Sequence, residues 1–186
     1  MQKVIAIDFD TVCNNLLIRW LKWLNRKHKL NKTCEDMTQW DMSKNIPELD
    51  PTQIYEPLFD ADFWAYVSVY PEVQTIIEEM RYAGYTPYIV TDTHYSSLKM
   101  KFENCLLPAL KEVIKPSDVI VTSHKELITC EYIIDDYEMN LKDNEGFRIL
   151  IDEPYNRNAN KDYYDFRTHS LKDAWEYIKL RKAFEL

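Results

Sequence analysis

Residues 3–12 read Lys3-Val4-Ile5-Ala6-Ile7-Asp8-Phe9-Asp10-Thr11-Val12, a short apolar run that ends in two carboxylates. A run this short and this apolar predicts a strand buried on both faces, as in the middle of a parallel sheet. Because side chains alternate along a strand, Asp8 and Asp10 are expected on one side, beyond its carboxyl end. Ligands bind at that end in open α/β sheets. The alternative is a buried strand with a merely structural acidic turn, so partners at other strand ends are needed to decide.

The composition is that of an ordinary globular protein. Of 186 residues, 46% are hydrophobic and 29% are charged, which suits one domain with a sizeable core, or a domain that carries an insertion. The net charge of −8 disfavours polymeric nucleic acids and anionic membranes as partners, because both need a basic face. No run is apolar and long enough for a transmembrane helix, and no secretory signal is apparent. We therefore expect a cytoplasmic protein.

The numbers of glycines and cysteines limit the kinds of phosphate-binding and metal-binding site that the chain can form. The chain has only two glycines, Gly84 and Gly146, whereas a Walker loop or a dinucleotide fingerprint needs several at fixed spacing. Any phosphate must therefore be held by side chains, a metal ion and ordinary backbone amides. The four cysteines show no metal-ligand spacing and are expected to be reduced.

Strands and helices are expected to alternate along most of the chain. Apolar runs predict five strands, and apolar residues at helical spacing predict the flanking helices. The predicted strands are 4–7, 85–91, 118–122, 131–134 and 147–151, and the predicted helices are 14–30, 71–82, 96–113 with a kink at Pro108, and 170–183. The aromatic-rich residues 31–70 predict a small helical subdomain. The expected architecture is a Rossmann-like parallel sheet flanked by helices, with a core of residues 1–13 and 72–186 and a helical cap of residues 14–71.

Polar residues follow the other predicted strands in a suggestive order. Thr91 and Asp92 end the second strand, Lys125 follows the third, and Asp135 and Asp136 end the fourth. Parallel strand ends share one edge, so these groups can converge on the carboxylates of the first strand. Crowded carboxylates need a compensating cation, and oxygen ligands without histidine or thiolate favour Mg²⁺. Each residue alone has a structural explanation, but the ordered set favours a phosphoryl-transfer site.

The chemistry assigns different tasks to the first two carboxylates. Asp8 beside Mg²⁺ can attack phosphorus, and Asp10, two residues on, can protonate the leaving oxygen and later deprotonate water. A bacterial receiver domain uses similar groups. There, however, the acidic pair and the phosphorylated Asp precede the Thr and Lys, whereas here a second acidic pair comes last. The insertion after the first strand also disfavours a receiver.

The ordered set resembles the motifs of the haloacid dehalogenase superfamily of phosphatases. Those motifs are DxDx[TV], a strand-end Ser/Thr, a Lys and an acidic pair. Within that superfamily the chain looks most like the 5′(3′)-deoxyribonucleotidases. The segments that carry this closer resemblance are Asp62-Phe63-Trp64 before Pro71, Val-Thr-Ser-His-Lys at 121–125, Ile-Ile-Asp-Asp at 133–136, Ile-Leu-Ile-Asp-Glu-Pro-Tyr-Asn-Arg at 149–157 and Ser-Leu-Lys-Asp-Ala-Trp-Glu-Tyr-Ile at 170–178.

The resemblance implies roles for the matching residues. Asp8 is the expected nucleophile and a Mg²⁺ ligand. Asp10 is the expected acid/base and offers its backbone carbonyl to the metal. Asp136 is the expected direct acidic ligand, with Asp135 beside it.

The resemblance also implies a substrate site. The phosphate is expected between Thr91, Lys125 and the backbone amides of Phe9 and Asp92. Trp40 and Trp64 are expected to contact the base, since a nucleobase stacks well on an indole, although either could instead belong to the core of the cap.

These inferences predict a Mg²⁺-dependent phosphomonoesterase that hydrolyses deoxyribonucleoside 5′- or 3′-monophosphates through an aspartyl-phosphate. Two alternatives stay open: a phosphatase for another small phosphomonoester such as a sugar phosphate, and a non-catalytic homologue that only binds a ligand. Two positions depart from the family pattern. Thr11 stands where many relatives have glycine, and Asp92 stands where these nucleotidases often have serine.

Overall fold

The computed structural model describes residues 3–184 and contains a single parallel sheet of six strands. The strand order is β3-β2-β1-β4-β5-β6. The strands are β1 (Lys3–Ile7), β2 (Tyr85–Thr91), β3 (Val119–Val121), β4 (Tyr132–Asp135), β5 (Phe147–Ile151) and β6 (Phe166–Thr168). The five predicted strands are confirmed, and the short edge strand β6 was not predicted. The outermost residues of the predicted core, 1–2 and 185–186, lie outside the described part.

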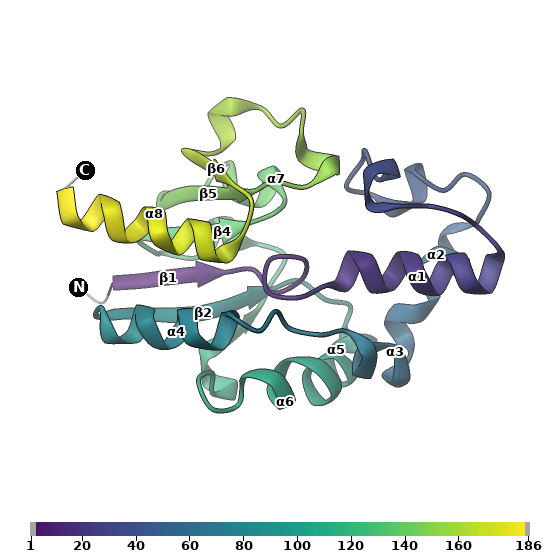
Figure 1. Cartoon of the computed structure of the whole chain (residues 1–186), viewed down its shortest axis with the longest axis horizontal. Coiled ribbons are helices and arrows are strands. Elements are labelled where there is room, and N and C mark those ends of the chain that lie inside the picture. The colour runs from purple at the N-terminus through teal and green to yellow at the C-terminus, as the bar shows by residue number, and fades with distance from the viewer. Residues whose placement is uncertain (1–2, 185–186) are drawn as a thin grey trace.

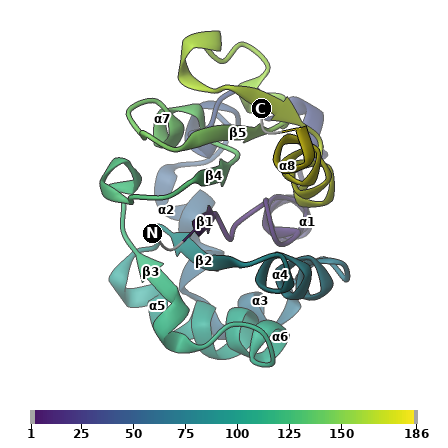
Figure 2. The ribbon, with the colours of Figure 1, turned by 90° about the vertical axis from the view of Figure 1, so that its left-hand side faces the viewer.

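Helices surround the sheet, and the Rossmann-like α/β class predicted from the sequence is confirmed. Figure 2 shows α4 and α8 on one face and α7 on the other. The α-helices are α1 (Leu16–His28), α2 (Pro51–Tyr55), α3 (Ala61–Tyr66), α4 (Val73–Tyr82), α5 (Tyr95–Lys101), α6 (Leu107–Leu110), α7 (Glu138–Leu141) and α8 (Leu171–Phe184). Among residues 3–184, no helix combines the length and the apolar character needed to cross a membrane.

Local sequence explains where several helices begin and end. Asp50 and Gln53 form a capping box at the start of α2, and Ser170 caps α8 by accepting from the backbone N–H of Asp173 (3.1 Å). Helix α4 ends at Gly84, whose φ of 88° is the left-handed conformation that glycine adopts without strain. The core helices therefore start and stop where the sequence predicts.

The predicted kink at Pro108 takes a different form in the structure. Between α5 and α6 the chain forms a π-helical turn, Phe102–Leu106, instead of a simple bend. Proline has no N–H to donate, and its ring clashes with the carbonyl four residues earlier. A widened turn directly before α6 relieves both problems.

The segment between β1 and α4 leaves the sheet and returns to it at one point. Asn14 and Val69 form an antiparallel bridge, and the backbone N–H of Tyr70 donates to the carbonyl of Cys13 (2.9 Å). Figure 1 shows α1, α2 and α3 at the end of the molecule opposite the two termini, beyond the carboxyl ends of the strands. We call residues 14–71 the insertion; its role as a cap stays a prediction.

The sheet places two strand ends side by side at its centre. The chain passes from β3 at one edge to β4 at the other side of β1, so β1 and β4 lie at the point where strand order reverses. This is the position at which open α/β sheets bind ligands. It brings the end of β1, with Asp8, next to the end of β4, with Asp135.

Candidate active site

The two aspartates after β1 are each held by a buried lysine. The Lys125 ammonium donates to Oδ1 of Asp8 at 2.5 Å, and the Lys101 ammonium donates to Oδ2 of Asp10. Asp8 is only 7% exposed. No residue among 3–184 donates to its other carboxylate oxygen, which leaves Oδ2 of Asp8 available to a ligand.

The loop after Asp10 is organised by Asn14. Its side-chain oxygen accepts from the backbone N–H of Thr11 (3.2 Å) and of Leu16 (2.9 Å), and its amide donates to Oδ1 of Asp10 (3.3 Å). Thr11 sits at φ 66°, in the left-handed region, and lines the same cavity as Tyr155. The loop thus orients Asp10 through Asn14.

The two aspartates at the end of β4 differ in how their oxygens are used. Both oxygens of Asp135 accept hydrogen bonds, from Lys125 (2.6 Å), from the backbone N–H of Tyr137 (2.9 Å) and from Asn140 (3.0 Å). Asp136 accepts from the Tyr155 hydroxyl through one oxygen, and no donor to the other is found among residues 3–184. Asp136 is therefore the member of the pair with an oxygen to spare.

Three of these carboxylates fit the demands of a divalent cation. Oxygens of Asp8, Asp135 and Asp136, all buried, lie within 4.8 Å of one another. Burial raises the pKa of Asp8 and of Asp136, and the neighbouring carboxylates add to the effect. An all-oxygen donor set with uncompensated negative charge suits Mg²⁺, whose usual protein ligands are carboxylates.

Lys125 is charged despite its burial. Burial alone would lower its pKa, but the carboxylates of Asp135 and Asp8 outweigh that effect and raise it. Two of the three ammonium protons bond to those carboxylates, which leaves one for an anionic group of a ligand.

A cavity of about 230 Å³ opens onto these groups. Its lining combines the polar motif residues with apolar side chains of the insertion. The lining residues are Asp8, Asp10, Thr11, Leu16, Leu17, Trp20, Trp40, Met42, Tyr55, Leu58, Asp92, Lys125, Asp136, Asn140 and Tyr155. This lining suits a ligand with an anionic part and a flat or apolar part.

The structure brings most of the predicted site residues together around this cavity. Asp8, Asp10, Asp92, Lys125 and Asp136 line it, and so does Trp40 of the insertion, whose ring stacks on Tyr137 at 4.3 Å. The other predicted residues stand behind the lining: Phe9, Thr91, Asp135 and Trp64.

Trp64 does not lie where a base-contacting residue should. It is 2% exposed, its indole N–H donates to the carbonyl of Leu58 (2.9 Å), and it is absent from the cavity lining. The geometry therefore favours the other interpretation of Trp64, as a packing residue of the insertion.

Sequence reasoning missed several residues that hold the site. Lys101, Asn14, Asn140 and Tyr155 all bond to motif carboxylates. Lys101 stands on the buried face of its helix between Ser97 and Cys105, at i−4 and i+4, and that burial is seen only in the structure. The others come from loops or short helices, where sequence spacing does not indicate a direction.

Comparison with protein families gives a match over nearly the whole chain. Residues 2–184 match the model of the family described as 5′ nucleotidase, deoxy (Pyrimidine), cytosolic type C protein. A 5′(3′)-deoxyribonucleotidase of Bacillus subtilis is 34% identical over 163 residues, which cover 87% of this chain and 91% of the relative. A 5′(3′)-deoxyribonucleotidase of Clostridium acetobutylicum is 29% identical over 179 residues, which cover 91% of this chain and 96% of the relative.

Solved structures agree on the fold. A haloacid dehalogenase-like protein from Agrobacterium tumefaciens superposes with a TM-score of 0.69 at 12% identity, over 98% of this chain and 100% of that one. A haloacid dehalogenase family hydrolase from Deinococcus radiodurans gives a TM-score of 0.67 at 14% identity, over 100% and 97%. The chain thus has a haloacid dehalogenase-like fold and belongs to the 5′ nucleotidase, deoxy (Pyrimidine), cytosolic type C family of phosphomonoester hydrolases.

Proposed function

We propose that this phosphomonoester hydrolase is Mg²⁺-dependent and cleaves deoxyribonucleoside 5′- or 3′-monophosphates through an aspartyl-phosphate. The observation that carries the proposal is the cavity, whose lining combines Asp8 and Asp10 with apolar side chains of the insertion. The relatives named 5′(3′)-deoxyribonucleotidase support the substrate class. A location in the cytoplasm stays a prediction, as does the absence of nucleic-acid and membrane partners.

In this mechanism Oδ2 of Asp8 attacks phosphorus, and the bond from phosphorus to the ester oxygen breaks. Asp10 gives its proton to the departing nucleoside hydroxyl. Asp10 then accepts a proton from water, whose oxygen attacks the phosphorus and frees inorganic phosphate and Asp8. The third proton of Lys125 would hold a phosphate oxygen. Thr91, the other predicted phosphate contact, has no exposed surface, and its hydroxyl accepts from Lys101 (2.6 Å).

Asp8 and Asp136 would hold Mg²⁺, with the backbone carbonyl of Asp10. The positive charge of the ion would offset the repulsion between the phosphate and the carboxylates. Asp135, whose oxygens are occupied by protein donors, would serve to fix Lys125 between the two acidic groups.

The test is phosphate release from deoxyribonucleotide, ribonucleotide and sugar monophosphates, with and without EDTA. We expect release from deoxyribonucleoside monophosphates that EDTA abolishes and Mg²⁺ restores. The variant Asp8→Asn should release no detectable phosphate, while Asp143→Asn, at an exposed position outside the site, should match the wild type.

Each outcome discriminates among the candidates. Faster release from sugar phosphates than from any nucleotide would favour the alternative substrate class. No release from any ester would leave a ligand-binding homologue. An Asp8→Asn variant as active as the wild type would exclude the aspartyl-phosphate.

A further inference from the structure

Lys101 is a charged side chain with no exposed surface. It is 0% exposed, at the end of α5, and none of the predicted motifs includes it. Lysine is almost never fully buried unless it is paired, because removing an ammonium from water is costly. A buried lysine at this place therefore needs partners strong enough to keep it there.

The acceptors of its hydrogen bonds belong to the residues predicted for the active site. The ammonium donates to Oδ2 of Asp10, to the hydroxyl oxygen of Thr91 (2.6 Å) and, more weakly, to the carbonyl of Asp92 (3.5 Å). An ammonium has three protons, and these three acceptors use them. Lys101 has no proton left for a substrate, in contrast to Lys125.

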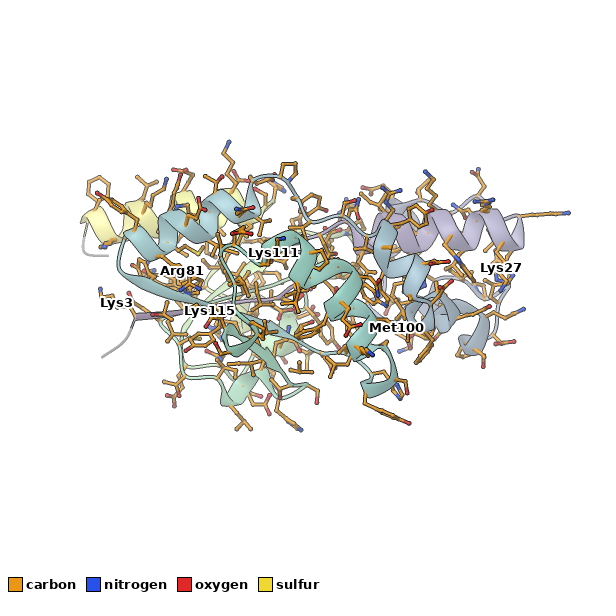
Figure 3. The ribbon with its side chains drawn as sticks, turned by 90° about the horizontal axis from the view of Figure 1, so that it is seen from below. Lys3, Lys27, Arg81, Met100, Lys111 and Lys115 are labelled. Carbon is orange, nitrogen blue, oxygen red and sulfur yellow. The ribbon has the colours of Figure 1, made fainter. Side chains whose placement is uncertain are left out.

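The helix is distorted where Lys101 stands. The π-helical turn Phe102–Leu106 begins at the next residue, and the side-chain amide of Asn104 donates to the carbonyl of Met100 (2.9 Å). Figure 3 labels Met100 on this helix. Single π-helical turns are rare and are found frequently at functional sites. Here the turn lies between Lys101 and α6, so the Lys101 side chain need not follow the regular spacing of the helix after it.

We propose that Lys101 is a positioning residue for proton transfer by Asp10, an inference that rests on the proposed function. It ties the acid/base carboxylate after β1 to the hydroxyl of Thr91 at the end of β2. Asn14 holds the other oxygen of the same carboxylate, so the orientation of Asp10 is set from both sides. Without Lys101 the carboxylate turns away from the leaving oxygen, while Asp8 and its partner Lys125 stay in place.

The test uses two substrates that differ in their need for an acid. A nucleoside hydroxyl leaves with a proton from Asp10, whereas p-nitrophenolate is a good enough leaving group to depart without one. We expect Lys101→Met to lower kcat/KM for a deoxyribonucleoside monophosphate about 10²-fold, the low end of what general acids contribute, and to change kcat/KM for p-nitrophenyl phosphate little. Lys99→Met, at an exposed position of the same helix, should change neither value.

The outcomes separate this inference from the proposed function. Equal losses on both substrates would mean that Lys101 only supports the structure, and would overturn the inference. If the wild type hydrolyses neither substrate, the proposed function fails instead.

A second variant covers the case in which Lys101→Met does not fold. The double variant Asp10→Asn/Lys101→Met removes both charges of the pair and is compared with Asp10→Asn alone. A residue that acts only through Asp10 adds nothing once Asp10 is gone, so the two variants should have the same kcat/KM for the nucleotide. A further drop in the double variant would also overturn the inference.

Discussion

At the scale of single residues, Thr11 shows how the catalytic loop is built. Its φ of 66° is unusual for a β-branched residue, and relatives with glycine at this position would adopt it freely. The backbone N–H of Thr11 donates to the side-chain oxygen of Asn14 (3.2 Å), which helps to hold the residue in this conformation.

Two substitutions at this position separate strain from the lost hydroxyl. Both Thr11→Gly and Thr11→Ala remove the hydroxyl, but only glycine relieves the left-handed strain. We expect Thr11→Gly to be more stable than Thr11→Ala by about 1 kcal/mol in denaturant unfolding, the usual cost of this conformation for a residue with a Cβ. Equal stabilities would show that the loop relaxes out of the left-handed region.

The sequence predicts some site residues well and others not at all, for a physical reason. Asp8, Asp92, Lys125 and Asp136 are predictable because each follows a strand, and parallel strands deliver their ends to one edge. Lys101 looks like any helical lysine until the π-helical turn and the burial of its helix face are seen. Its contacts depend on how α5 is placed beside Asp10 and Thr91, which residue spacing does not encode.

At the scale of elements, prediction succeeds for long periodic segments and fails for short ones. Strand β6 is three residues long, Phe166–Thr168, with an arginine in the middle, so it lacks the apolar run that marks the other strands. It forms only because β5 offers an unpaired edge. In the insertion, α1 was predicted from its apolar face. The start of α2 was predicted from Asp50, Pro51 and Gln53, whereas α3, with six residues, was expected only as part of a helical region.

The insertion supplies apolar side chains to the cavity lining, and Trp40 is the side chain with which this contribution can be measured. Trp40 is 51% exposed and stacks on Tyr137. We expect Trp40→Ala to raise KM for a deoxyribonucleoside monophosphate about tenfold, because stacking of a base on an aromatic ring contributes roughly 1–3 kcal/mol, and to leave KM for a sugar phosphate unchanged. Tyr66→Ala is the matched control, since Tyr66 is exposed on α3 and absent from the lining. An unchanged nucleotide KM in Trp40→Ala would exclude base stacking there.

At the scale of the whole molecule, the insertion is attached to the core by contacts around the cavity. Arg157 donates to both carboxylate oxygens of Glu35 (2.6 and 2.9 Å), Trp40 stacks on Tyr137, and α3 packs against the π-helical turn. Away from the insertion, Arg81, labelled in Figure 3, donates to the carboxylate of Asp118 before β3 (2.8 Å). Residues 14–71 are inserted between two parts of the core in chain order, but they pack closely on it. The predicted division into a core domain and a cap domain therefore stays a prediction.

Glu153 gives a pH dependence to the stability of the whole fold. It lies on the same loop as Arg157, where burial, with a further contribution from Asp152, raises its pKa from 4.5 to about 7. Between these two values the folded chain binds a proton that the unfolded chain has lost, so this group makes the free energy of unfolding fall as pH rises through that range. Above pH 7 the folded state carries the full cost of a buried negative charge.

Replacement by glutamine should remove that cost. We expect Glu153→Gln to raise the free energy of unfolding at pH 8 by more than about 1 kcal/mol, since one pKa unit corresponds to about 1.4 kcal/mol, and the gain should shrink steadily as pH falls to 5. Urea unfolding at pH 5, 6, 7 and 8 measures it, with Glu145→Gln at an exposed position as the control that shows no such trend. If the glutamine variant is no more stable than the wild type at pH 8, the negative charge of Glu153 costs no stability. Arg157 would then pair with both Glu153 and Glu35 in solution.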